Sequence, residues 1–186
     1  MDFPVHVAAG ALAGSILLYV CAKENEVSGE LTMTRSETFK LGAAGCFFGV
    51  LTHLLLDALP YYDWLFYIAM FKPLPYGWAI PTVFVTVPVI MTIFYLNKDA
   101  RIVAGLSMFG GMYPDIEKLA YFDANLPRFC VLFPFHSCQL SSSRWELSHK
   151  YELIVMEICL FALMMYAMIW LTIERKHIRH SLCQAG

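Results

Sequence analysis

His53 and Asp57 stand four residues apart, at the end of a long apolar run. If this run is helical, both side chains lie on one face of the helix, one turn apart. An imidazole and a carboxylate arranged in this way can bind one metal ion together. Because ionisable groups are costly in or near a bilayer, they usually serve a function or are paired. The alternative is a His–Asp hydrogen bond that ties this helix to its neighbours.

Other residues of the same chemistry lie far away in the sequence. They are His6 near the start of the chain, Asp115 and Glu117 after a glycine pair, and His136 beside a serine. Imidazole and carboxylate ligands suit zinc, and carboxylate-rich sites also suit manganese or iron. Simpler interpretations are an interfacial anchor for His6 and a helix cap for Asp115. We predict a divalent metal site, with zinc favoured, formed by His6, His53, Asp57, Asp115 and His136.

The elements that must position these residues are apolar helices. The chain has 186 residues, of which 59% are hydrophobic and 15% are charged, a composition typical of membrane proteins. Spanning helices need about 20 apolar residues. Five apolar segments are expected to be helical, and they cover about 4–22, 39–59, 79–96, 102–113 and 151–173.

The remaining stretches complete the predicted architecture. Residues 60–78 are rich in aromatic residues and proline, which predicts an interfacial loop. Residues 114–148 are expected to form a long loop before the last helix. The predicted fold class is therefore all-α, a polytopic membrane helical bundle of about five apolar helices. It forms a single membrane-embedded domain over residues 1–174, followed by a short basic tail over 175–186.

The basic tail sets the orientation. Arg175, Lys176 and Arg179 directly follow the last apolar segment, which predicts a cytoplasmic C-terminus. Five spans then place the start of the first helix and the ends of the second and fourth helices at the opposite face. The candidate ligands on these segments would meet there.

The sequence argues against several other function classes. A net charge of -2, without a basic patch interleaved with aromatics, argues against a nucleic-acid partner. The chain has no G-x-S-x-G elbow, no phosphate-binding glycine loop and no C-x-x-C pair. A transporter would carry polar groups at mid-helix, whereas here they cluster at helix ends.

Four short motifs together resemble a known family. They are Phe3–His6, His53–Pro60, Gly111–Glu117 and Phe135–Ser137. With them the chain resembles the small prokaryotic integral-membrane proteins grouped as metal-dependent hydrolases, which include the LexA-regulated, YdjM-like proteins. The resemblance implies a multi-helix protein of the prokaryotic inner or plasma membrane with a His/Asp metal site. The chain departs from the family pattern at Tyr61, where histidine is common, at Glu117, where aspartate is common, and in the order of the motifs.

The predicted function is hydrolysis of an ester or phosphoester at the membrane surface, with lipids among the candidate substrates. A bound metal would activate water, with Asp115 and Glu117 as the catalytic carboxylates. The alternative is a non-catalytic membrane protein in which the same His/Asp cluster holds the helices together.

Overall fold

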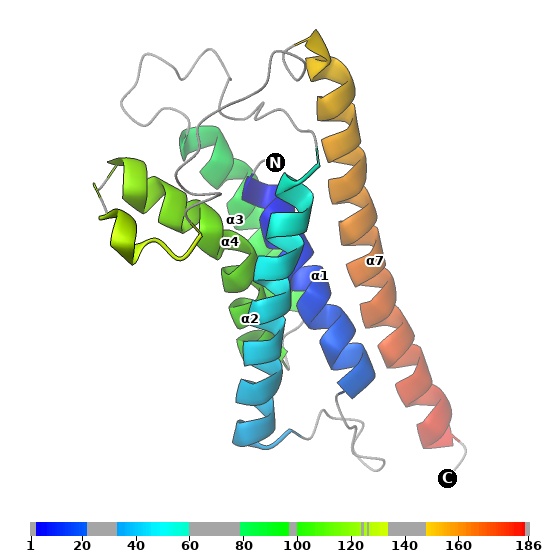
Figure 1. Cartoon of the computed structure of the whole chain (residues 1–186). Helices are drawn as coiled ribbons and strands as arrows, with labels where there is room; N and C mark the ends of the chain where they lie inside the picture. The colour runs from blue at the N-terminus through cyan, green and yellow to red at the C-terminus, as the bar shows by residue number, and fades with distance from the viewer. Residues whose placement is uncertain are drawn as a thin grey trace.

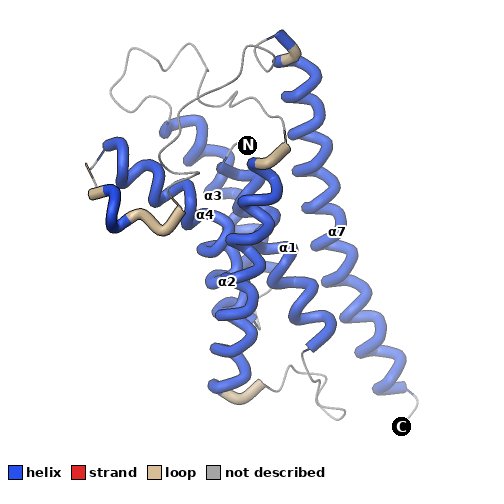
Figure 2. The backbone as a smooth tube through the Cα atoms, viewed as in Figure 1, coloured by secondary structure: helices blue, strands red, loops and turns tan. Residues whose placement is uncertain are grey.

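The computed structural model describes residues 3–21, 33–59, 79–96, 100–123, 125, 127–133 and 148–184. Within these residues the regular structure is helical and contains no strand (Figure 2). The α-helices are α1 (Phe3–Cys21), α2 (Arg35–Asp57), α3 (Ala79–Leu96), α4 (Arg101–Asp123) and α7 (Lys150–Gln184), and η3 (Arg128–Cys130) is a short 3-10 helix. The prediction of an all-α chain with about five helices is confirmed for the described residues.

Three of these helices are long and apolar enough to cross a membrane. The spans are Pro4–Cys21, Arg35–Asp57 and Lys150–Glu174, and α3 contributes a shorter apolar helix over Val83–Tyr95. Many of their large hydrophobic side chains point outward, as for Phe47 on α2, which is 65% exposed. An apolar outer surface of this extent is unusual in a soluble protein and suits contact with lipid. These helices indicate a membrane protein.

The start of α2 is fixed by a local sequence signal. The Thr34 side chain accepts a hydrogen bond from the backbone N–H of Glu37 at 3.2 Å. In return, the Glu37 carboxylate accepts one from the backbone N–H of Thr34 at 2.8 Å. This capping box satisfies two backbone donors that the first turn would otherwise leave without helical partners. It determines where α2 begins.

The fourth helix is longer than the sequence predicted. The expected segment ended at residue 113 because Pro114 was interpreted as the start of a loop, but α4 continues through Pro114 to Asp123. A proline inside a helix removes only one backbone hydrogen bond, and packed neighbours can compensate for that loss. In Figure 1 the last part of α4 extends sideways, away from α1 and α2. Similarly, the expected tail continues α7 in helical form as far as Gln184.

Helices α1, α2 and α4 pack against one another at the centre of the structure, while α7 packs on α1 and α3 packs on α1 and α4. The central contact is made by small residues. A Cβ added to Gly10 of α1 would lie 3.2 Å from the Cα of Gly111 on α4. A Cβ on Gly49 of α2 would lie 2.8 Å from the nitrogen of the same Gly111. Small residues thus let three backbones approach closely.

Apolar side chains fill the remaining interfaces. One cluster joins Met168 of α7 to Val7 and Ala11 of α1, and to Ile93 of α3. A second cluster joins Met164 to the start of α1 through Val5, Ala8 and Ala9. Because α7 contacts the bundle mainly through α1, most of its surface remains available to lipid (Figure 1).

Candidate metal centre

Three helices bring four metal-ligand side chains to one point. His6 comes from the first turns of α1, His53 and Asp57 from the last turns of α2, and Asp115 from the second half of α4. One donor atom from each residue lies within 4.8 Å of all the others. Figure 1 shows the start of α1 beside the end of α2. Four of the five predicted ligands therefore converge, although they span more than half of the chain.

The shortest distances centre on Asp57. Its Oδ1 lies 3.1 Å from Nε2 of His6, and its Oδ2 lies 3.3 Å from Nε2 of His53. The second distance confirms that His53 and Asp57 share one helical face. Oδ1 of Asp115 lies 3.9 Å from Nε2 of His53. The two imidazole rings stack, with their centroids 3.7 Å apart. Both Nε2 atoms point to the Asp57 carboxylate.

The orientation of His53 is fixed by the backbone of α4. Its Nδ1 lies 2.7 Å from the carbonyl oxygen of Gly111. Since a carbonyl can only accept, Nδ1 carries the hydrogen, and the neutral ring then has its lone pair on Nε2. Metal-binding histidines generally have such an outer hydrogen bond, which fixes the tautomer and the ring direction.

This tautomer makes the centre suitable for a cation. The Nε2 lone pair of His53 faces the carboxylate oxygens of Asp57 and Asp115, so acceptors face acceptors. Either a proton or a metal ion must lie between them to make the arrangement favourable. Two carboxylates with two neutral imidazoles carry a charge that one divalent ion balances. Both imidazoles are fully buried, where an unbalanced charge would be costly.

The spacing of the donor atoms also fits a small metal ion. Zinc bonds to nitrogen and oxygen are about 2.0–2.1 Å long, so tetrahedral ligand atoms lie roughly 3.3 Å apart. The observed separations of 3.1, 3.3 and 3.9 Å bracket that value. The residues present therefore form a group that could hold a metal ion, and small side-chain movements would close it around one.

A glycine stands one turn from the ligands on each of the three helices. Gly10 follows His6 by four residues, Gly49 precedes His53 by four, and Gly111 precedes Asp115 by four. These same glycines make the close contacts between α1, α2 and α4. Because the backbones almost touch one turn away, the short side chains of histidine and aspartate can reach a common point. Sequence analysis did not use this Gly/ligand spacing, although it is visible in the chain.

Glu117, predicted as a second catalytic carboxylate, lies outside this group. It stands two residues from Asp115, so the two side chains leave α4 in nearly opposite directions. Its Oε2 accepts a hydrogen bond from the N–H of Leu132 at 3.0 Å, and its Oε1 accepts one from the N–H of Phe133 at 2.8 Å. Glu117 thus binds the backbone of the segment that follows α4. Its catalytic role stays a prediction.

Two other histidines remain. His136, the fifth predicted ligand, lies outside the described residues, so its role stays a prediction. His149 is half-buried near the start of α7, where its Nδ1 lies 2.9 Å from the Ser148 hydroxyl. It does not belong to the four-residue group.

Comparisons with protein-family models, with curated proteins and with solved structures gave no match. The class of protein is therefore defined by its own features. In its described residues it is an all-helical protein, with helices long and apolar enough to span a membrane and a two-histidine, two-aspartate centre.

Proposed function

We propose that the protein is a membrane-bound, metal-dependent hydrolase that cleaves an ester or phosphoester bond at the membrane surface. The observation that carries the proposal is the convergence of His6, His53, Asp57 and Asp115 from three helices. The four-motif resemblance to membrane metal-dependent hydrolases supports it. Zinc suits the two imidazoles and two carboxylates best, and manganese or iron is the alternative.

The membrane arrangement belongs to the same proposal. The helices form a polytopic bundle in a prokaryotic inner or plasma membrane, with the basic C-terminal end in the cytoplasm. The metal centre lies near the start of α1 and the end of α2, which in the proposed arrangement are at the headgroup level of the opposite face. A lipid substrate would reach such a site without leaving the membrane.

The residues of the centre have different roles in the proposed reaction. When bound, the metal would lower the pKa of a coordinated water to about 7, which supplies a nucleophile at neutral pH. Asp57 lies between the two imidazoles and orients both. Asp115 is the more open carboxylate, with a side chain 20% exposed against 10% for Asp57. Asp115 is therefore the group placed to accept a proton from an attacking water.

A second function is favoured by the same short distances. The separations of 3.1 and 3.3 Å around Asp57 are close to hydrogen-bonding range without any metal. In this alternative, the cluster is an interhelical polar network that holds α1, α2 and α4 together, and the protein has no catalytic activity.

A hydrolysis assay separates the two functions. The full chain, purified in detergent and supplied with zinc, manganese or iron, would be incubated with phospholipids and with soluble phosphoesters. We expect turnover by the wild type and a loss of about 10²–10⁴-fold in Asp115→Asn, the usual contribution of a general base. His149→Ala is the matched control, because this histidine lies outside the centre and its loss should leave turnover unchanged. Absence of turnover in metal-loaded wild type would favour the structural network.

A further inference from the structure

We propose that the segment Pro127–Phe133 is a lipid-contacting arm, whose Phe129 and Leu132 enter the headgroup boundary of an anionic membrane while Arg128 meets lipid phosphate. The inference is independent of hydrolysis and concerns a part of the chain outside the metal centre. It starts from η3, a short helix that follows α4 in the chain.

The arm presents large apolar side chains outward. Phe129 is 89% exposed, the highest value among the large hydrophobic side chains of the described residues, and Leu132 is 67% exposed. Arg128 is exposed beside them. Single exposed apolar residues are ordinary, but two within four positions next to a cation form the composition that binds membrane interfaces.

The structure holds this outward orientation in place. Both carboxylate oxygens of Glu117 accept hydrogen bonds from the arm, from the N–H groups of Leu132 and Phe133. Glu117 is only 4% exposed, so these charge-assisted bonds form away from water, where they are strong. The Phe133 ring also packs edge-on against the Tyr113 ring of α4, with 6.3 Å between centroids. One side of the arm is therefore fixed on α4, and the other side carries the exposed side chains of Phe129 and Leu132.

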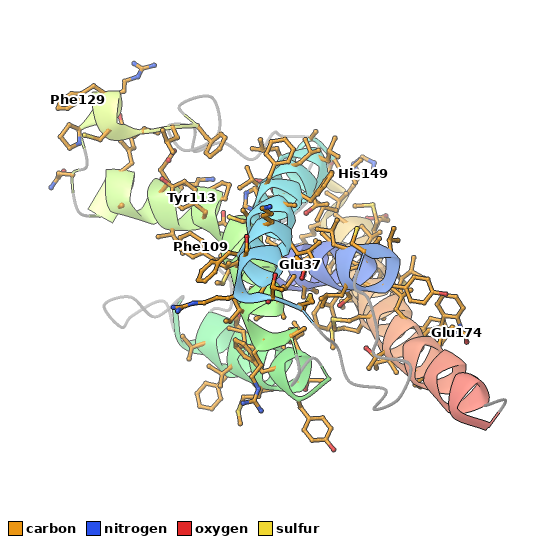
Figure 3. All side chains as sticks on the ribbon, turned by 90° about the horizontal axis from the view of Figure 1, so that it is seen from below. Glu37, Phe109, Tyr113, Phe129, His149 and Glu174 are labelled. Carbon is orange, nitrogen blue, oxygen red and sulfur yellow. The ribbon has the colours of Figure 1, made fainter. Side chains whose placement is uncertain are left out.

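The position of the arm points to lipid as the occupant. In Figure 1 the arm lies at about the height of the α1 start and the α2 end, beside the last part of α4. Figure 3, turned to look along the bundle, shows Phe129 at the outer edge of the molecule, well to the side of the central helices. A lateral projection level with the ends of apolar spans lies where headgroups would be. Arg128 complements the phosphates there, and each basic residue near an anionic surface adds to binding.

Fluorescence in vesicles tests the proposal. The full chain carrying Phe129→Trp would be reconstituted into phosphatidylcholine–phosphatidylglycerol vesicles, with or without bromine atoms on the upper acyl chains. Because the wild type contains four tryptophans, the signal is the tryptophan emission of the variant minus that of the wild type. We expect this emission to be blue-shifted, quenched by the brominated lipid and protected from acrylamide in water. Leu132→Trp should give the same three results, and it provides an independent test if the Phe129→Trp variant folds poorly.

Gln184→Trp is the control, because Gln184 ends α7 ten residues beyond the last residue of the apolar span Lys150–Glu174. Its added emission should be quenched by acrylamide and insensitive to bromine. Adding Arg128→Gln to Phe129→Trp should reduce the blue shift in anionic vesicles to that seen in pure phosphatidylcholine. The proposal is overturned if the residue-129 and residue-132 tryptophans are open to acrylamide and insensitive to bromine, which would leave this face to water or a protein partner. An unchanged blue shift after Arg128→Gln would overturn the assigned phosphate contact.

Discussion

Replacing Gly111 by alanine should damage the protein, although the same change at Gly105 of the same helix should not. A Cβ at residue 111 would meet the carbonyl oxygen of His6 at a separation shorter than real Cβ contacts allow, and would lie 3.2 Å from the Cα of Gly10. Both obstacles are backbone atoms, so no side-chain rotation can relieve the clash. Helix α1 would have to move away from α4 and carry His6 with it.

The expected magnitude follows from two opposing effects. Alanine is better than glycine inside a helix by about 1 kcal/mol. Overpacking at a tight contact costs about 1–3 kcal/mol, and a backbone contact belongs at the upper end of that range. We expect a net loss of about 2 kcal/mol, which is roughly a thirty-fold change in an equilibrium constant. Metal sites tolerate ligand displacements of only about 0.2 Å, so metal affinity should fall as well.

Gly105→Ala is the internal control. A Cβ there would touch only the Phe94 ring, at 3.6 and 3.8 Å, which is ordinary contact. This variant should be as stable as the wild type or up to about 1 kcal/mol more stable, with unchanged metal content. Thermal unfolding in one detergent and metal analysis would measure both variants. If Gly111→Ala matches Gly105→Ala in stability and metal content, the close approach of α1 and α4 does not support the centre.

Three further predictions concern separate parts of the structure. Glu117→Gln should lower the free energy of unfolding by about 1.5–3 kcal/mol, because two backbone N–H groups lose a charged acceptor; chemical denaturation would measure it, and metal content should not change. Thr34→Ala should cost about 1 kcal/mol through loss of the α2 cap, and an unchanged unfolding temperature would contradict the role of the capping box. A chelator should lower the unfolding temperature of metal-loaded wild type, since a ligand bound only by the folded state stabilises it, and should have no effect on His53→Ala.

The sequence predicted much of the helical framework and the core of the centre. The spacing of His53 and Asp57 alone required a shared helical face, and the structure has it at 3.3 Å. His6 and Asp115 could be brought to the same end only by counting spans, because no local pattern links residues that are distant in the chain. Their approach depends on how closely three backbones pack, which is a property of the tertiary structure.

Two features were beyond the sequence analysis for identifiable reasons. Proline normally ends a helix, so the continuation of α4 through Pro114 was missed; neighbouring helices support it there. The contacts of Glu117 were also missed, since a helix turns about 200° over two residues and Glu117 therefore leaves α4 on another side than Asp115. Its partners are the backbone N–H groups of Leu132 and Phe133. Almost every residue has such a group, so the sequence does not show which ones Glu117 binds.

The central claim is that His6, His53, Asp57 and Asp115 hold a metal ion. Elemental analysis of the detergent-purified full chain tests it most directly, beside His53→Ala, Asp57→Asn and the outlying control Glu117→Gln. We expect near-stoichiometric zinc, manganese or iron in the wild type and in Glu117→Gln, and its loss in the other two variants. A folded wild-type protein that takes up no metal, even when these ions are supplied, would contradict the account and identify the cluster as a structural network.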